Sequence, residues 1–283
     1  MWTLSGFADE ISPDLDGQCR VLDELGVRYL EFRSAWQTNV LDLDDAQLDR
    51  VGKTLAEHGL RVSSIGSPIG KIGVADDFEE HLRRFDRALA VAALLGAPYV
   101  RLFSFFLPAG DDPASHRDEV LRRMAALADR AAGHSAEHSA EHGVILLHEN
   151  EKGIYGDSPA RCLDIVESVG SPRLRLAWDA ANFVQCGFRP HTDGYAMLRP
   201  HLEYVQIKDA VLATGEVVPA GRGDGEVRET LRALRADGFT GFFSLEPHLA
   251  AAGPFGGFSG PELFGVAHAA FTDLLVEEGI EYR

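Results

Sequence analysis

The sequence predicts a single (β/α)₈ barrel that spans residues 1–283. Short apolar strands alternate with longer amphipathic helices along the whole chain, in eight strand–helix units. No second composition and no long linker divides the chain, and its length is common for one α/β barrel. The rival is a doubly wound open sheet, which usually carries a glycine-rich turn after its first strand. The segment GFADEIS has no such turn, so the barrel is favoured.

The eight units follow one another in order. We expect strands near residues 2–8, 27–33, 61–66, 98–104, 144–149, 174–179, 203–208 and 241–246. We expect helices over 13–26, 45–58, 77–96, 114–142, 158–169, 226–237 and 261–279, with a weak pattern near 193–200 that reads mostly as loop. The helix at 77–96 is the clearest, because it keeps the 3.6-residue period and stops at a glycine.

Composition narrows the classes of partner. The net charge of −17 repels phosphodiester backbones, so we expect no nucleic acid, although local Arg and Lys residues could still hold a small anionic substrate. Three scattered cysteines do not make a disulfide framework or a structural zinc site. The start of the chain lacks a signal-peptide pattern, and no apolar run approaches the ~20 residues of a membrane span. We therefore expect a reduced, cytoplasmic protein that does not bind membranes.

A tandem repeat, GHSAEHSAEHG, places His134, His138 and His142 on one helix face. This spacing can bind zinc. The plainer interpretation is a solvated helix face lengthened by a short duplication, and the segment precedes its strand, at the end of the barrel opposite the expected active face. We favour the second interpretation.

Polar residues follow four consecutive strands at the points where these strands end. They are Glu149 after the fifth, Asp179 after the sixth, Gln206, Lys208 and Asp209 in the seventh, and Glu246 followed by His248 after the eighth. Active sites of (β/α)₈ barrels lie at these carboxyl ends, so three carboxylates would meet in one small space. A single carboxylate there often pairs with a Lys or Arg, but three together repel one another unless a cation neutralises them. Oxygen ligands suit Mg²⁺ or Mn²⁺.

With these residues identified, the sequence resembles the xylose isomerase-like barrel superfamily, and within it the sugar phosphate isomerase/epimerase group that includes ketose 3-epimerases. The resemblance covers nearly the whole chain, in FADEIS, SPIGKI, RLFSFF, HENEKGIYGD, WDAANF, IKDA, PAGRGDG and SLEPH. The order of these segments and their strand positions are specific for the superfamily, but not for a substrate.

The resemblance implies a divalent metal held by a Glu, an Asp, a His and a Glu. Glu149, Asp179 and Glu246 match this pattern, but Gln206 stands where the family usually has His. Asn182 likewise stands where the epimerases have a substrate-contacting His. Gln206 can still bind a metal through its carbonyl oxygen, and an all-oxygen site favours Mg²⁺, Mn²⁺ or Ca²⁺ over Zn²⁺ and Co²⁺. We expect Mn²⁺ or Mg²⁺ as the cofactor.

The function implied by the resemblance is a metal-dependent sugar isomerase or epimerase. In such enzymes one Glu removes the proton next to a carbonyl, an enediolate forms, and the other Glu returns the proton to the opposite face. Glu149 and Glu246 would be this catalytic pair. With a leaving group at the β carbon the same proton abstraction becomes elimination, so a lyase acting on a 3-keto-glycoside is the alternative. A non-catalytic sugar-binding protein is a second alternative, because two family positions are changed.

Candidate substrate contacts lie at strand ends and in loops. They are Glu10, Arg33, Lys71, Arg101, Lys152, Asn182, Lys208, Arg222 and His248, of which Lys71 and Lys208 lie in the tightest settings. For each charged one a salt bridge within the rim is an equally good interpretation. The glycines of PAGRGDG could cradle a phosphate. His248, two residues past Glu246, could take the place of the missing His ligand. A small carbohydrate is the expected partner, and a homo-oligomer is compatible with the sequence.

Overall fold

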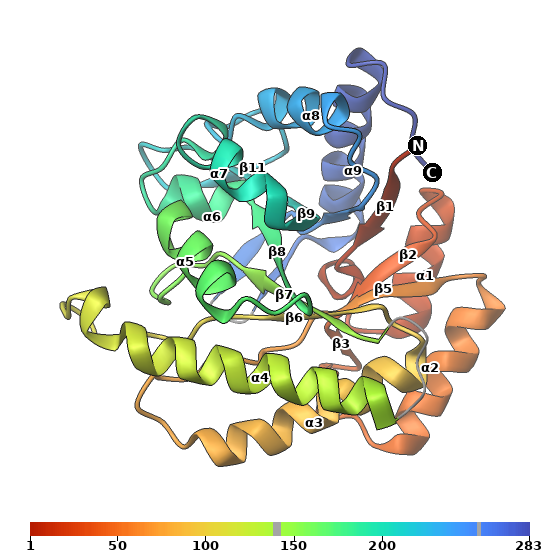
Figure 1. Ribbon diagram of the computed structural model, residues 1–283. Helices are drawn as coiled ribbons and strands as arrows, with labels where there is room; N and C mark the ends of the chain where they lie inside the picture. Colours follow the sequence, from red (N-terminus) through yellow and green to blue (C-terminus); the bar gives the residue numbers. More distant parts are fainter. Residues whose placement is uncertain (138–142, 254–255) are drawn as a thin grey trace.

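The computed structural model describes residues 1–137, 143–253 and 256–283, and it confirms the predicted barrel. Eight parallel strands surround one axis and the helices lie outside them (Figure 1). The strands are β1 (Thr3–Gly6), β2 (Tyr29–Phe32), β5 (Arg61–Ile65), β6 (Tyr99–Leu102), β7 (Ile145–Glu149), β8 (Leu174–Asp179), β9 (Leu202–Ile207) and β12 (Phe242–Leu245). They are hydrogen-bonded in the order β1-β12-β9-β8-β7-β6-β5-β2, and β2 returns to the side of β1, so the barrel is nearly closed.

Side-chain caps mark the starts of several helices. The long ones are α1 (Leu15–Glu24), α2 (Asp45–Glu57), α3 (Phe78–Leu95), α4 (Arg117–Glu137), α5 (Pro159–Val169), α8 (Val227–Ala236) and α9 (Gly260–Glu277). At the start of α3, Asp77 accepts hydrogen bonds from the next turn, and Gly96 ends the helix in the left-handed conformation. The expected helix at 114–142 corresponds to α4. Residues 138–142, with His138 and His142, lie outside the described residues.

The segment between β8 and β9 is more helical than expected, although its geometry is irregular. A short helix, α6 (Ala180–Gln185), follows Asp179 directly and was not predicted. The weak pattern near 193–200 corresponds to a π-helical turn (Pro190–Tyr195), α7 (Ala196–Leu198) and a 3₁₀ turn (Arg199–His201). These pieces are too short for the 3.6-residue period to reveal them. Because α6 begins directly after Asp179, Asn182 lies beside the end of β8.

Three two-stranded ribbons extend the loops beyond the barrel strands and were not predicted either. They pair β3 (Ser34–Ala35) with β4 (Thr38–Asn39), β10 (Asp209–Ala210) with β11 (Val217–Val218), and β13 (Ala251–Gly253) with β14 (Gly256–Phe258). Each ribbon follows the carboxyl end of a barrel strand, where loops carry the functional residues of this fold. At the other end of the barrel the two termini pair, with the Trp2 N–H donating to Glu281 O at 2.8 Å (Figure 1).

Alternate side chains of each strand point into the barrel, and along β9 these inward side chains change from apolar to polar toward the mouth. Tyr204 packs with Leu147 and Ala177 in an apolar layer inside the barrel. Two residues further along the same strand is Gln206, and two further still is Lys208, so both face the same interior nearer the mouth. The polar residues predicted at strand ends therefore lie above an apolar floor.

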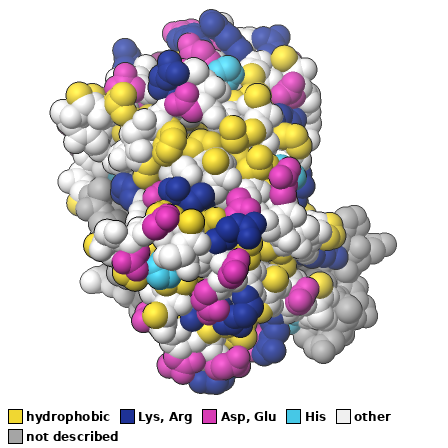
Figure 2. Space-filling view, turned by 60° about the vertical axis from the view of Figure 1, so that its left-hand side comes forward, with side chains coloured by type: hydrophobic (Ala, Val, Ile, Leu, Met, Phe, Trp, Pro, Cys, Tyr) yellow, Lys and Arg dark blue, Asp and Glu magenta, His cyan; other side chains and the backbone are white. Residues whose placement is uncertain are grey.

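The surface carries mixed charge. On the face shown in Figure 2, Lys and Arg side chains are interspersed with Asp and Glu side chains, and apolar side chains gather above its middle. The described part of this face therefore presents no continuous basic surface of the kind that binds a phosphodiester backbone. Among the described residues, no helix is both long and apolar enough to pass through a lipid bilayer.

Candidate active site

Three buried carboxylates meet at the mouth of the barrel. Glu149 ends β7, Asp179 ends β8, and Glu246 directly follows β12. One oxygen from each of these side chains lies within 4.8 Å of the others, and none of the three residues is more than 3% exposed. The carboxyl ends of neighbouring parallel strands converge in a closed barrel, so residues 97 positions apart along the chain share one space. We call these three residues the acid cluster.

Two cations lie directly among the oxygens of the acid cluster. Lys208 Nζ is 2.8 Å from Asp179 Oδ2 and 3.0 Å from Glu246 Oε2. Arg101 Nη1 is 3.0 Å from Glu149 Oε2 and 3.5 Å from Glu246 Oε1. The carboxylates of the acid cluster are therefore partly neutralised by salt bridges, which was the alternative interpretation of each carboxylate in the sequence. Both cations are at most 4% exposed, and a buried charge of this kind is stable only when it is paired.

Glu246 has more cationic neighbours than the other two carboxylates. In addition to Lys208 and Arg101, Arg33 Nη1 donates to Glu246 Oε1 at 3.0 Å. Burial raises the pKa of Glu246, but Lys208, His248 and Arg101 outweigh it and hold that pKa well below its usual range. At Glu149, burial dominates, and Glu246 adds to it against Arg101, so the pKa of Glu149 is raised to about 8. The two predicted catalytic carboxylates therefore lie in different electrostatic environments.

Amide side chains position the acid cluster. Asn182 donates from Nδ2 to Glu149 Oε1 at 3.1 Å, and its backbone N–H donates to Asp179 Oδ1 at 2.8 Å. Asn150 donates to the carbonyl of Asp179 and accepts from its N–H, at 2.9 and 3.0 Å. The side-chain amide of Asn182 thus holds Glu149, while its backbone holds Asp179. Asn150 lies beside Glu149 in the sequence, and its role was not predicted.

The residues present fit a divalent cation bound by oxygen ligands. Gln206 Oε1 is buried and accepts no hydrogen bond from any residue within the described ranges, whereas Glu149 Oε2 and Asp179 Oδ2 are ion-paired with Arg101 and Lys208. Gln206 turns its NH₂ group toward Glu31 Oε1, at 3.5 Å, which leaves the carbonyl oxygen as the atom available to a ligand. Gln206 also pairs in register with Asp179 across β9 and β8. Oxygen atoms of this kind are preferred by Mg²⁺ and Mn²⁺.

A second cluster adjoins the first through Glu246. His248 Nε2 lies 3.2 Å from Glu10 Oε1 and 3.4 Å from Glu246 Oε1. Glu10 is fully buried and accepts hydrogen bonds from the His248 N–H and the Ser259 hydroxyl, at 2.8 and 2.9 Å. His248 has a left-handed backbone with φ of +48°, which is uncommon for a non-glycine residue. Its ring lies so close to Gly257 that a side chain there would collide with it.

The glycine loop PAGRGDG binds the carboxylate of Asp209 and does not form a phosphate cradle. The N–H groups of Gly221, Gly223 and Gly225 all donate to the carboxylate of Asp209, at 2.8–3.0 Å. These donors are therefore already satisfied within the chain, and the expectation of a phosphate cradle is corrected. Arg222 lies in the same loop and is exposed. Its predicted contact with substrate stays a prediction.

The two remaining predicted lysines lie at the rim, beside the acidic residue Glu151. Lys71 Nζ is 3.2 Å from Glu151 Oε2 and lies over the ring of Phe103. Lys152 Nζ is 3.1 Å from Glu151 Oε1 and donates to Asn182 Oδ1 at 3.2 Å. Lys152 therefore supports the amide that holds Glu149, while Lys71 lies next to a cavity on the other side of the site.

Several polar residues of the site were not predicted. Glu31 in β2 is buried beside Gln206, and burial raises its pKa to about 7. Asp9 accepts hydrogen bonds from Arg33 and Ser34, at 2.7 and 2.9 Å. The sequence held a signal for Glu31, since an acid inside an apolar strand two residues before Arg33 faces the same interior. Asp9 gave no comparable signal, because its partner lies 24 residues away.

The fold and the site together define a (β/α)₈ barrel with an acidic cluster at the carboxyl ends of its strands. The sequence model of the xylose isomerase-like TIM barrel family matches residues 19–261, and the chain therefore belongs to that family. A 2-epi-5-epi-valiolone 7-phosphate 2-epimerase from Actinoplanes sp. is 35% identical over 149 residues. That alignment covers 53% of this chain and 50% of the relative, so it spans about half the length of each.

Solved structures share the fold at low identity. A D-tagatose 3-epimerase-like protein has a TM-score of 0.76 at 14% identity, with 98% of each chain covered. The probable 3-DHS dehydratase AsbF from Bacillus anthracis has a TM-score of 0.72 at 18% identity, with 96% of this chain and 98% of that chain covered. A xylose isomerase-like TIM barrel protein from Mycobacterium smegmatis, in complex with magnesium, has a TM-score of 0.68 at 22% identity, over 98% and 96%. Epimerase-like and dehydratase-like proteins thus share this fold.

Proposed function

We propose that the protein is a divalent-metal-dependent sugar isomerase or epimerase that removes and returns a proton next to a carbonyl group. The observation that carries this proposal is the acid cluster, in which two carboxylates with different surroundings lie beside a third, above an apolar floor. Membership of the xylose isomerase-like family supports it, as does the similarity of half of the chain to an epimerase. The complex of a similar barrel with magnesium is consistent with the proposed Mg²⁺ or Mn²⁺.

The residues divide the work as follows. Glu149, Asp179, Gln206 and Glu246 would hold the cation, which when bound supplies Lewis-acid polarisation of a substrate carbonyl. Glu246, ionised beside Lys208 and Arg33, is suited to accept the proton at a carboxylate oxygen. Glu149 is suited to deliver a proton to the other face of the same carbon. Asn182 fixes one Glu149 oxygen at 3.1 Å, and the other, Oε2, lies 3.0 Å from Arg101 Nη1.

The same first step serves a lyase, which is the alternative proposal. Elimination needs a leaving group one carbon further from the carbonyl and an acid that protonates it. Lys208, whose ammonium lies 3.0 Å from Glu246 Oε2, would be this acid. The similarity to the probable dehydratase AsbF concerns the fold alone, so it does not favour elimination over epimerisation.

Exchange of the substrate α-proton with solvent tests the proposal for both reactions. The protein would be incubated with Mg²⁺ or Mn²⁺ in D₂O with a panel of ketoses, ketose phosphates and 3-keto-glycosides, and deuterium uptake followed by NMR. We expect exchange with at least one substrate and its loss when the metal is removed by a chelator. Analysis of the products then separates epimerisation from elimination. Exchange that persists without metal would contradict the metal dependence, and binding of a sugar without exchange would favour the non-catalytic alternative.

A further inference from the structure

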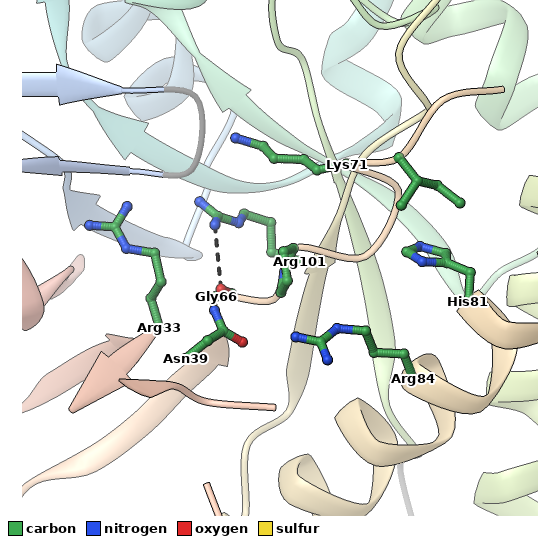
Figure 3. A pocket seen from close by; sticks show the side chains of 9 residues that line it. Arg33, Asn39, Gly66, Lys71, His81, Arg84 and Arg101 are labelled. Carbon is green, nitrogen blue, oxygen red and sulfur yellow. Dashed lines mark hydrogen bonds between the residues drawn. The ribbon is translucent and has the colours of Figure 1, made fainter. Parts of the chain in front are cut away.

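A cavity beside the acid cluster is lined by cations. It has a volume of about 340 Å³ and lies between the ends of β2, β5 and β6 and the start of α3. Its lining includes Arg33, Asn39, Lys71, His81, Arg84 and Arg101 (Figure 3). We call it the cationic pocket. We infer that it binds the anionic oxygens of a phosphoryl or carboxylate group on the substrate. This inference rests on the proposed function and names a class of substrate for it.

The charge of the lining is the first argument. Four of the lining side chains are Lys or Arg, and none is Asp or Glu, although the chain as a whole carries a net charge of −17. The carboxylates that pair with the two rim cations stand outside the lining: Asp42 holds Arg84, and Glu151 holds Lys71. Cations concentrated in a concave surface with low-dielectric walls focus a positive field on a ligand, and this favours anions.

Donor groups in the lining provide the second argument. Arg84 uses Nη1 and Nη2 for Asp42, at 2.8 and 3.1 Å, whereas a guanidinium carries five N–H donors. Arg101 is 3% exposed, and its Nε–H is buried without a hydrogen-bond acceptor in the described parts of the chain. Asn39 accepts a hydrogen bond from the Leu41 N–H through Oδ1, so its NH₂ group supplies a further donor. A phosphoryl or carboxylate group offers the acceptors that such donors lack.

The loop that carries Lys71 is held rigidly. His81 accepts a hydrogen bond from the Gly70 N–H at 2.8 Å. Gly70 has φ of +88°, and a side chain at this position would lie 1.9 Å from the carbonyl oxygen of Phe103. The Lys71 ammonium lies 4.3 Å from the centre of the Phe103 ring. The position of this cation is therefore set before a ligand arrives, which reduces the entropy lost on binding.

The cationic pocket and the acid cluster are in direct contact. Arg33 and Arg101 line the pocket, and both also lie beside Glu246, at 3.0 and 3.5 Å. Phe7 lies against both guanidiniums, 4.5 and 4.8 Å from its ring centre. A substrate with its carbonyl at the acid cluster could therefore place an anionic group at its other end in the pocket. Binding energy at that remote end orients the reacting carbon.

The test measures anion binding without turnover. Inorganic phosphate and acetate would each be titrated calorimetrically into the wild type, Arg84→Gln and Arg87→Gln at low salt. Arg87 is a matched control, because it is also on α3, pairs with Asp45 at 2.9 Å and is outside the lining. We expect Arg84→Gln to weaken binding of the preferred anion by at least about fivefold and Arg87→Gln by less than about twofold, since only Arg84 faces the pocket.

Each outcome decides a question. Tighter binding of phosphate indicates a phosphorylated substrate, and tighter binding of acetate indicates a carboxylic acid. Equal losses in Arg84→Gln and Arg87→Gln, or no binding of either anion, overturn the inference. Lys71→Gln provides a second variant in case Arg84→Gln does not fold, with the same expected loss. Because these titrations need no catalysis, a protein that binds phosphate but exchanges no α-proton contradicts the proposed function and leaves the pocket assigned.

Discussion

The ammonium nitrogen of Lys208 lies 2.8 Å from Asp179 Oδ2. The same nitrogen lies 3.0 Å from Glu246 Oε2. A fixed cation of the chain thus neutralises the two carboxylates that would also bind a metal. Burial lowers the pKa of Lys208, but Asp179 and Glu246 outweigh it and raise that pKa well above its usual value. Lys208 therefore stays charged.

Replacing Lys208 by Met should make the protein depend on its metal for stability. Two buried carboxylates would lose a partner, and loss of one member of a buried ion pair typically costs ~3–5 kcal/mol. Addition of Mg²⁺ should then raise the melting temperature more in Lys208→Met than in the wild type. Thermal unfolding with and without Mg²⁺ measures this, and Lys53→Met, at an exposed position on α2, is the control. An equal magnesium effect in all three proteins would show that Lys208 and the metal do not share these oxygens.

Gln206→His should change the preference of the site among metals. An imidazole suits Co²⁺, Ni²⁺ and Zn²⁺ better than an amide oxygen does, so affinity for these ions should rise more than affinity for Mg²⁺. Competition binding on the purified protein measures the four affinities. Equal gains for all of them would mean that Gln206 does not touch the ion.

Glu149→Gln and Glu246→Gln should each retain part of the metal affinity and lose proton transfer. The amide keeps a ligand oxygen but cannot act as a base, so exchange of the substrate α-proton should fall by ~10² or more. Exchange into D₂O, followed by NMR, measures the rate. Glu203→Gln is the control, since Glu203 lies near the start of β9, where it accepts a hydrogen bond from Tyr99. Wild-type exchange in both active-site variants would refute the catalytic assignment.

The contribution of His81 to stability should fall in mild acid. Burial lowers its pKa to about 4 from 6.5, and Arg84 and Arg123 add to this. Between these two values the unfolded chain binds a proton that the folded protein does not, so stability is lost as pH falls from about 6.5 to about 4. The contribution of His81 between pH 7 and pH 5 is ~2 kcal/mol.

The measurement compares urea unfolding of the wild type and His81→Gln at both pH values. Gln can still accept the hydrogen bond of the Gly70 N–H, which is 2.8 Å from His81 Nε2, but it does not titrate. The change in stability between pH 7 and pH 5 should therefore be less unfavourable in the variant than in the wild type. The same loss in both proteins would show that another group causes the acid sensitivity.

The sequence by itself determined the barrel and the place of the acid cluster. Hydrophobic periodicity is a local property, so each of the eight strands could be located from its own residues. The rule that strand ends converge then placed Glu149, Asp179 and Glu246 together, as the structure confirms. The irregular turns after Asp179 and the three ribbons were missed, because segments of two to six residues are too short to show a period.

Only the tertiary structure decided which charges face one another. Arg33 meets Glu246 across 213 positions of the chain, and Arg84 of α3 meets Asp42 in the turn before α2, so neither pairing has a local signal. Asp209 takes up the glycine N–H groups that had suggested a phosphate cradle. These partners are set by barrel closure and by the packing of loops on its rim, and burial requires each charge to find one. The sequence specifies on which strand or loop a charged side chain lies, whereas its electrostatic partner depends on which strands and loops become neighbours in the folded barrel.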